Sequence, residues 1–334
     1  MTKRVKLCVL IVVLTSIVIA VIIGVFSIKK EGVIWESYYD IRSEEGSFVL
    51  IDKDHIISTG YTDFNKNKDA LLLCFTKDGK RVFDRRYGGA SDDTGKIIVS
   101  LEDGYLIVGS TTSYGKNGSM DAWLVKVDKD GNEIWNRSYG GDGYDEFRSA
   151  ALRDEDIILA GMTSSHSGNS DWDAWLVKVD KDGNEIWNRS YGGEFTDLFN
   201  DVIIDEDRIV AVGHSEKGED KWYGLFVIAD DNGNKILEKE VESEESTGLS
   251  SVITLNGFYY AIGYEGVFGS GRDDLLLLKF DKNGNIVWKK LFGGKFEDAG
   301  VWLCGENNHL YLVGYKDRNG DFSYDFWILK LKIH

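Results

Sequence analysis

The stretch DAWLVKVDKDGNEIWNRSYGG, residues 121–141, returns without a single change at residues 173–193. The second copy begins 52 positions after the first, since 173 minus 121 is 52. Repetition at a period of about 50 residues is typical of array architectures, in which every repeat is one supersecondary unit. The duplicated stretch therefore indicates the unit from which the chain is built.

Related units follow one another along almost the whole chain. Their first residues are Asp69, Asp121, Asp173, Tyr223, Asp274 and Asp325. In the clearest unit, residues 121–128 alternate, a tight turn with Gly131 at positive φ follows, and residues 133–140 return. FRSAALRD and DIILAGMT, at 147–154 and 156–163, add two more strands without helical periodicity. Each unit is expected to form a four-stranded sheet.

The two ends of the chain complement each other. The last unit, DFWILKLKIH at residues 325–334, stops after one strand, and GVIWESYY at residues 32–39 resembles the strand that should come next. Pairing of these segments would close a ring and remove exposed sheet edges. The sequence therefore predicts an all-β fold, a six-bladed β-propeller of four-stranded blades. Its sixth blade would combine residues 299–334 with about 32–40.

Two columns of residues fit this ring. The second strand of each blade carries a glycine, which allows close approach of neighbouring backbones: Gly60, Gly109, Gly161, Gly213, Gly263 and Gly314. The outermost strand carries a large apolar residue suited to the space between blades: Trp35, Phe83, Trp135, Trp187, Leu237 and Trp288. A tryptophan stripe can also bind sugars, but the regular spacing favours packing.

The repeats resemble a family of bacterial and archaeal cell-surface β-propellers. The shared pattern is YGG, a short acidic loop, Gly-x-Thr, and DAWLVKVDxxGNxxW, here Tyr139-Gly140-Gly141, Gly161-Met162-Thr163 and residues 173–187. The turn and Trp element also looks like the tryptophan-docking motif of quinoprotein-type propellers. The resemblance covers residues 31–334 and implies a fold, but no activity, because propellers serve as enzymes, binders and scaffolds alike.

Residues 1–30 have a different character. Basic residues precede the uncharged segment 7–28, and Lys29 and Lys30 follow it. A helix over these 22 residues would be about 33 Å long, enough to cross a bilayer. We expect residues 1–30 to form a cytoplasmic stub and a single-pass membrane anchor, with the propeller, residues 31–334, outside the cell. A cleaved signal peptide is the alternative.

The net charge of −17 argues against nucleic acid as a partner, because phosphate binding needs clustered Lys and Arg. The partners expected instead are the membrane, through residues 7–28, and a surface protein or glycan.

An acidic column recurs on the face that carries the longer loops. Its members, which we predict to lie near the mouth of the central channel, are Glu45, Asp93, Asp145, Asp197, Glu245 and Asp298. These carboxylates could bind Ca²⁺ or a cationic partner. Alternatively, each could accept hydrogen bonds from its own loop or from the next blade.

The sequence predicts no cofactor and leaves two alternatives open: calcium, and the quinone cofactor of a dehydrogenase, which only the turn and Trp element supports. Two loops have oxygen-bearing side chains in a stepped pattern, with candidate ligands Asp63, Asn65, Asn67, Asp317, Asn319 and Asp321. Neither loop has the Gly at position six and the Glu at position twelve of a helical calcium loop.

The motifs of common catalytic centres are missing from the sequence. The histidines, among them His166 and His214 in the long-loop regions of adjacent blades, lack the spacing of a metal pair, and no nucleophile elbow or phosphate loop occurs. We therefore expect a binding or scaffold module at the cell surface. The alternative is an extracellular polysaccharide hydrolase or lyase that uses channel-mouth carboxylates.

Overall fold

The computed structural model describes residues 44–64, 67–168, 171–218, 221–266, 273–318, 320 and 324–333. In these residues the chain is all-β apart from the short 3-10 helix η1 (Lys116–Gly118). The predicted membrane helix at 7–28 and the predicted closing strand at 32–40 lie outside this part of the chain. Within the described part, no helix is long and apolar enough to cross a membrane.

The described strands form six antiparallel sheets, each made of consecutive strands. The first sheet contains β1 (Glu44–Asp52), β2 (His55–Phe64), β3 (Asn67–Thr76) and β4 (Arg81–Tyr87). The second contains β5 (Asp93–Ser100), β6 (Gly104–Thr111), β7 (Asp121–Asp128) and β8 (Glu133–Tyr139). The third contains β9 (Asp145–Arg153), β10 (Asp156–Thr163), β11 (Asp173–Val179) and β12 (Glu185–Tyr191).

The second half of the chain continues the series. The fourth sheet contains β13 (Asp197–Asp205), β14 (Arg208–Glu216), β15 (Trp222–Ala229) and β16 (Lys235–Val241). The fifth contains β17 (Ser246–Leu255), β18 (Phe258–Gly266), β19 (Asp274–Phe280) and β20 (Ile286–Phe292). The sixth has three strands among the described residues, β21 (Asp298–Glu306), β22 (His309–Asp317) and β23 (Tyr324–Lys332).

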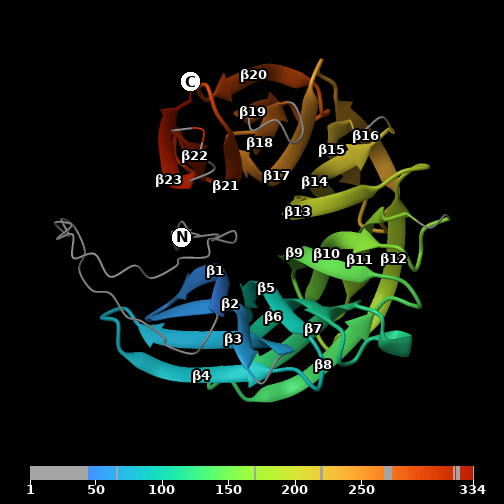
Figure 1. Ribbon diagram of the computed structural model, residues 1–334, viewed down its shortest axis with the longest axis vertical. Helices are drawn as coiled ribbons and strands as arrows, with labels where there is room; N and C mark the ends of the chain where they lie inside the picture. Colours follow the sequence, from blue (N-terminus) through green and yellow to red (C-terminus); the bar gives the residue numbers. More distant parts are fainter. Residues whose placement is uncertain are drawn as a thin grey trace.

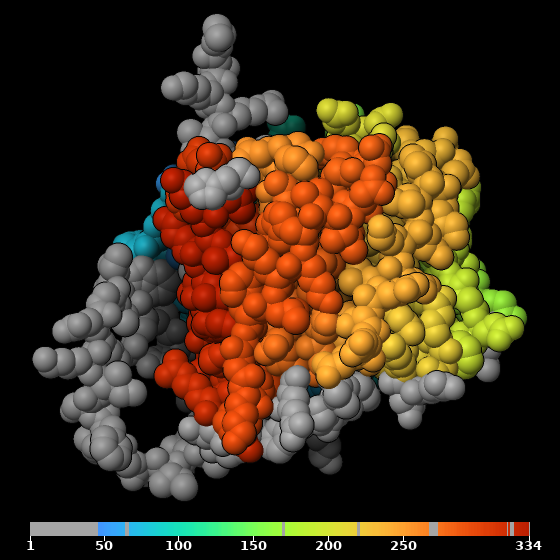
Figure 2. Space-filling view, turned by 90° about the horizontal axis from the view of Figure 1, so that it is seen from above, coloured from blue at the N-terminus to red at the C-terminus, as the bar shows by residue number. Residues whose placement is uncertain are grey.

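The six sheets are arranged as the blades of a ring. The first strand of every blade faces the centre of the ring (Figure 1), and the inner strands of blades two to six each pack against the preceding blade. In Figure 2 the blades of the second half of the chain stand side by side, from yellow through orange to red. Blades one and six touch through Phe48 and Trp302, whose ring centroids are 5.9 Å apart. The six-bladed β-propeller is confirmed, whereas closure by residues 32–40 stays a prediction.

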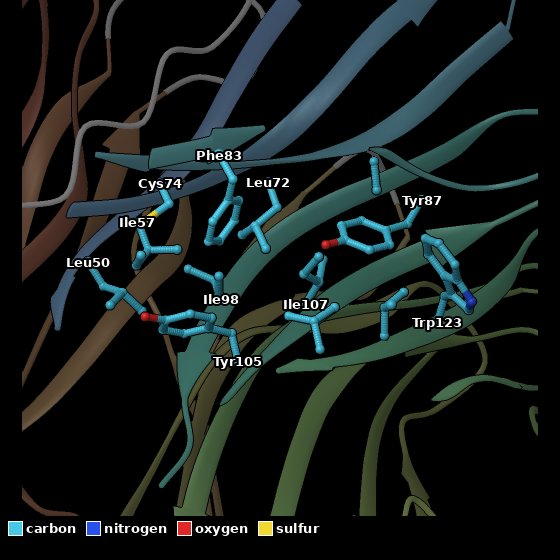
Figure 3. Packing of buried hydrophobic residues seen from close by; sticks show 13 residues of the cluster. Leu50, Ile57, Leu72, Cys74, Phe83, Tyr87, Ile98, Tyr105, Ile107 and Trp123 are labelled. Atoms are coloured by element: carbon cyan, nitrogen blue, oxygen red, sulfur yellow. The ribbon is translucent and has the colours of Figure 1, made fainter. Parts of the chain in front are cut away.

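The hydrophobic core lies between the blades, in five clusters that each join two neighbours. Figure 3 shows the cluster between blades one and two, where Ile57 and Leu72 meet Ile98 and Tyr105. The middle strands are covered on both sides, so β11 is buried at every position, and its sequence is almost continuously apolar. The outermost strand β12 is largely exposed and largely polar.

The outer edges of neighbouring blades are joined by the turn and Trp element. The Tyr139 hydroxyl donates a hydrogen bond to the Gly183 carbonyl of the next blade at 2.7 Å, and Tyr87 and Tyr191 do the same at the equivalent turns. The Trp135 ring packs against the same turn, so closely that a Cβ added to Gly183 would lie 2.9 Å from it. Phe83, Trp187 and Leu237 contact the glycines of the equivalent turns, so these described members of the apolar column are docking elements between blades.

A β-bulge interrupts the inner strand of every blade at the same place. Opposite the glycine column of the second strands, the register skips one residue, which is Ser47, Lys96, Arg148, Asn200, Ser250 or Val301. The bulge brings an inner-strand carbonyl onto the glycine, so that a Cβ at Gly161 would overlap the Glu146 carbonyl oxygen. The predicted close approach is therefore an approach within each blade.

We predict that Gly161→Ala destabilises the propeller by at least about 2 kcal/mol, because a rigid backbone carbonyl occupies the space that the methyl group needs. Urea unfolding of both proteins measures the difference. Gly193→Ala is the matched control, since nothing lies within 4 Å of a Cβ at Gly193. Equal midpoints for the two variants would contradict this account of the glycine column.

Candidate functional site

The predicted acidic column begins the inner strands, but its described aspartates are buried. Asp145 is fully buried and accepts hydrogen bonds from the hydroxyls of Thr163 and Ser165 and, at 3.1 Å, from the Gly141 amide. Its own amide donates to the Met120 carbonyl at 2.8 Å. These bonds hold together the loops around the start of β9, which is the framing role that the sequence left open.

The same frame recurs with variations in other blades. Asp93 is fully buried and accepts hydrogen bonds from Thr111 and Ser113. Asp197 accepts from the Gly193 amide at 2.9 Å, and the Asp298 carboxylate lies 3.0 Å from the Lys316 ammonium. Whether these four acids also bind a partner stays a prediction.

In blade five the acid and the hydroxyl of this hydrogen-bonded pair have exchanged strands. Strand register places Thr247 opposite Glu265, where the other blades have an acid opposite a hydroxyl or, in blade six, a lysine. The Glu265 carboxylate accepts a hydrogen bond from Ser243 at 2.6 Å. Glu245, the residue predicted here from the sequence, lies exposed in the preceding loop. The side chain of Glu45 lies outside the described residues, and its neighbour Glu44 pairs with Thr62.

The two identical repeats place the same aspartate in different surroundings. The Asp121 carboxylate accepts hydrogen bonds from the Ser119 hydroxyl at 2.8 Å and the Lys116 amide at 3.1 Å. In the second copy, Asp171 replaces Ser119, and Asp173 Oδ1 is buried without a hydrogen-bond partner. Burial, followed by the charges of Asp197 and Asp171, raises the pKa of Asp173 to about 6.

The predicted calcium ligands are only partly within the described chain. Asn67 donates its amide to the carbonyls of Gly89 and Ser91, and Asp317 accepts a hydrogen bond from the Gly320 amide at 2.7 Å. Asp63 is exposed, whereas Asn65, Asn319 and Asp321 lie outside the described residues. Among the residues that are described, no group of three or more His, Cys, Asp or Glu side chains is arranged to hold a metal ion.

The residues that form the bulges break the symmetry of the ring. Blades two, three and four have Lys96, Arg148 and Asn200 at this position, whereas blades one, five and six have Ser47, Ser250 and Val301. Bulges are frequent next to functional sites because they redirect a side chain.

These polar side chains form a series of contacts across three blades. We call it the charged chain, and its members are Lys96, Glu146, Arg148 and Asn200. Lys96 lies 3.2 Å from Glu146, and Arg148 donates to Glu146 at 3.0 Å. Burial opposes ionisation of Glu146, but the two cations outweigh it and lower its pKa. Glu146 is therefore an ionised counter-ion and an unsuitable general acid.

Asn200, at the far end of the charged chain, fixes the protonation state of His214. Arg148 only donates, so the Asn200 atom facing it at 2.9 Å is the carbonyl oxygen. The Asn200 amide nitrogen then donates to His214 Nε2 at 3.1 Å and to the Leu249 carbonyl at 2.8 Å. His214 is thus neutral with its proton on Nδ1, and burial, followed by the charge of Arg148, lowers its pKa to about 4.

The centre of the ring contains a cavity of about 570 Å³. Residues from all six inner strands line it, including Leu50, Ile97, Ala150, Ile203, Ile253 and Trp302. Ile97, Ser149 and Asp201 follow the bulge residues directly, so the charged chain lies at the long-loop end of the cavity. The Asp201 carboxylate is buried in the wall and accepts four hydrogen bonds, from Ser149, Ser251 and two backbone amides.

Exposed aromatic side chains gather on the long loops of blades two to four. The loops bounded by β6 and β7, by β8 and β9, by β10 and β11, and by β12 and β13 each carry one. These residues, between 37% and 56% exposed, are Tyr114, Tyr144, Trp172 and Phe195, which we call the aromatic sector. Among described aromatic residues, only Phe326 on β23 is comparably exposed. Clustered exposed aromatics are typical of binding surfaces.

Sequence reasoning missed both the charged chain and the aromatic sector. The available signal was variation within a repeat, since Lys96, Arg148 and Asn200 each stand three residues after a recurring acid. The recurring acidic column, by contrast, consists largely of residues that hold the loops together.

No family model matches the chain, and no curated protein matches it. Among solved structures, the chain is similar to an ulvan lyase of a polysaccharide lyase family, with 14% identity, coverage of 85% of this chain and 83% of that one, and a TM-score of 0.51. A Bacteroides uniformis protein assigned as a 6-phosphogluconolactonase has 11% identity, coverage of 84% and 82%, and a TM-score of 0.50. At these identities the likeness shows the fold alone, so the protein is a β-propeller whose activity must be argued from its own residues.

We predict that Asp173→Asn gains stability over the unchanged protein as the pH rises from 4 to 7. The folded-state pKa of about 6 lies above the ordinary 3.8, so ionisation of Asp173 costs stability progressively through this interval. Asparagine cannot ionise, and the relative gain reaches up to about 3 kcal/mol above pH 6. Thermal or urea unfolding at several pH values measures it.

Asp121→Asn is the matched control, because its carboxylate has hydrogen-bond partners that stabilise the charge. Its pH-dependent gain should be smaller. The same pH dependence in both variants would show that the different loops do not matter.

Proposed function

We propose that this protein is a non-catalytic binding module at the cell surface, anchored in the membrane by residues 7–28 and docking a basic surface protein through its aromatic sector. The observation that carries the proposal is the concentration of exposed aromatic side chains on the long loops of three adjacent blades. Rigid frames that carry variable loops are the usual support of binding sites.

Acidic residues beside the aromatic sector support a cationic partner. Asp142, Asp171 and Glu194 are exposed and stand within two residues of Tyr144, Trp172 and Phe195, respectively. Aromatic faces and carboxylates both attract Lys and Arg side chains, through cation–π contacts and ion pairs. The net charge of −17 would also speed the approach of a basic partner.

The membrane anchor and the external position of the propeller are proposed from the sequence of the first thirty residues. An impermeant amine-reactive label added to intact cells should modify the propeller, whose lysines would then be outside. Labelling only after lysis would contradict the proposed orientation.

The polysaccharide hydrolase or lyase has less support. The aspartates that it would use, Asp93, Asp145, Asp197 and Asp298, are buried in frame contacts. A catalytic role would need other carboxylates, and Glu146 is paired with two cations.

We predict that a photo-crosslinking amino acid at Tyr144, in the full-length protein on intact cells, forms an adduct with a basic surface protein. The matched control is the same group at Ile186, which is 51% exposed on the outer strand of the same blade.

Trp172→Ala should weaken partner binding at least tenfold, because exposed aromatics at the centre of an interface are frequent hot spots.

Three outcomes would overturn the proposal. Adducts of equal yield from both positions would mean non-specific encounter, and adducts with glycan alone would assign the sector to carbohydrate. Unchanged binding of Trp172→Ala would remove the aromatic sector from the interface.

A further inference from the structure

We propose that the central cavity and its charged rim form a separate binding site for a small amphipathic carboxylate, such as a straight-chain fatty acid. The site concerns the channel of the propeller and is independent of the surface partner proposed above.

The rim supplies the complement of a carboxylate. Lys96 and Arg148 come from adjacent inner strands, and their side chains are 45% and 30% exposed. Their shared counter-ion Glu146 is only 8% exposed, so two cations stand against one anion and leave one positive charge at the rim. A cationic rim in a chain of net charge −17 is a local exception. Lysine and arginine form their strongest hydrogen bonds with anions.

The cavity below the rim fits an apolar body. Its volume of about 570 Å³ lies within the range of small-molecule sites. Aliphatic side chains such as Ile97, Ala150 and Ile253 dominate the wall, with Trp302 at one side. A sugar would leave its hydroxyl groups without partners there, because a buried polar group needs a hydrogen bond.

The Asp201 carboxylate in the wall does not turn the cavity into a polar site. Asp201 already accepts hydrogen bonds from Ser149 at 2.7 Å, from Ser251 at 2.9 Å and from two backbone amides at 2.9 Å. It is satisfied within the protein, so the remaining open surface, to which the hydroxyls of Ser100 and Thr254 also belong, is mostly apolar. The ligand would place its carboxylate at Lys96 and Arg148 and its chain along the axis of the ring.

Equilibrium dialysis of the full-length protein against radiolabelled dodecanoate tests the site. We expect saturable binding of about one dodecanoate per chain, as a single cavity of this size implies. Unlabelled dodecanoate should displace the label, whereas dodecyltrimethylammonium, of the same chain length and opposite charge, should not.

Lys96→Gln should weaken dodecanoate binding about tenfold, because it removes a charge-assisted contact from an exposed position without emptying the core. The matched control is Lys77→Gln, since Lys77 is 53% exposed and paired with Asp54 on the opposite face. Ala150→Leu, which narrows the cavity, should also weaken binding, and the melting temperature of each variant shows that it is folded.

Absence of saturable dodecanoate uptake would overturn the proposal, as would equal affinities of Lys96→Gln and Lys77→Gln. Equal displacement by the cationic probe would reduce the site to an unspecific apolar surface. None of these results would affect the photo-crosslinking test of the surface partner, so the two proposals fail separately.

Discussion

The bulge that interrupts each inner strand opposite the glycine column is the constraint on which much of this propeller depends. It inserts one unpaired residue, and it pushes the Glu146 carbonyl and its equivalents onto the glycines of the second strands. That contact fixes the glycine column of the repeat. The inserted residue is left free of ladder pairing, so its identity can change without cost to the sheet. A position of rigid backbone and free side chain is suited to diversification, and Lys96, Arg148 and Asn200 occupy it in three adjacent blades.

The fold could be predicted from the sequence because the repeat records packing. Trp135 and Trp187 recur since each docks on the turn of the next blade, and Gly161 recurs since a carbonyl lies against it. Features that every blade needs are necessarily periodic, so a duplicated stretch of sequence reveals them. The closing strand at residues 32–40 rests on the same logic and stays a prediction.

The candidate site could not be predicted in the same way. Asp145 recurs because it holds two loops together, and its recurrence made it appear functional. The charged chain depends on contacts between blades, such as that of Arg148 with Asn200, which stands 52 residues later. The equivalent positions of blades one, five and six carry Ser47, Ser250 and Val301 instead. The aromatic sector is similarly confined to a few loops. A repeat pattern describes what blades share, whereas a binding site is built from their differences.

The exchanged pair in blade five bears on how such arrays diverge. Thr247 and Glu265 face each other in register, in the reverse order of Asp145 and Thr163. Two substitutions separate these arrangements, and one intermediate would bring two buried carboxylates together, at a large electrostatic penalty. The other intermediate carries two hydroxyls and loses only one ionic hydrogen-bond acceptor. For a direct exchange, loss of the inner acid before gain of the outer acid is therefore the order that avoids this penalty.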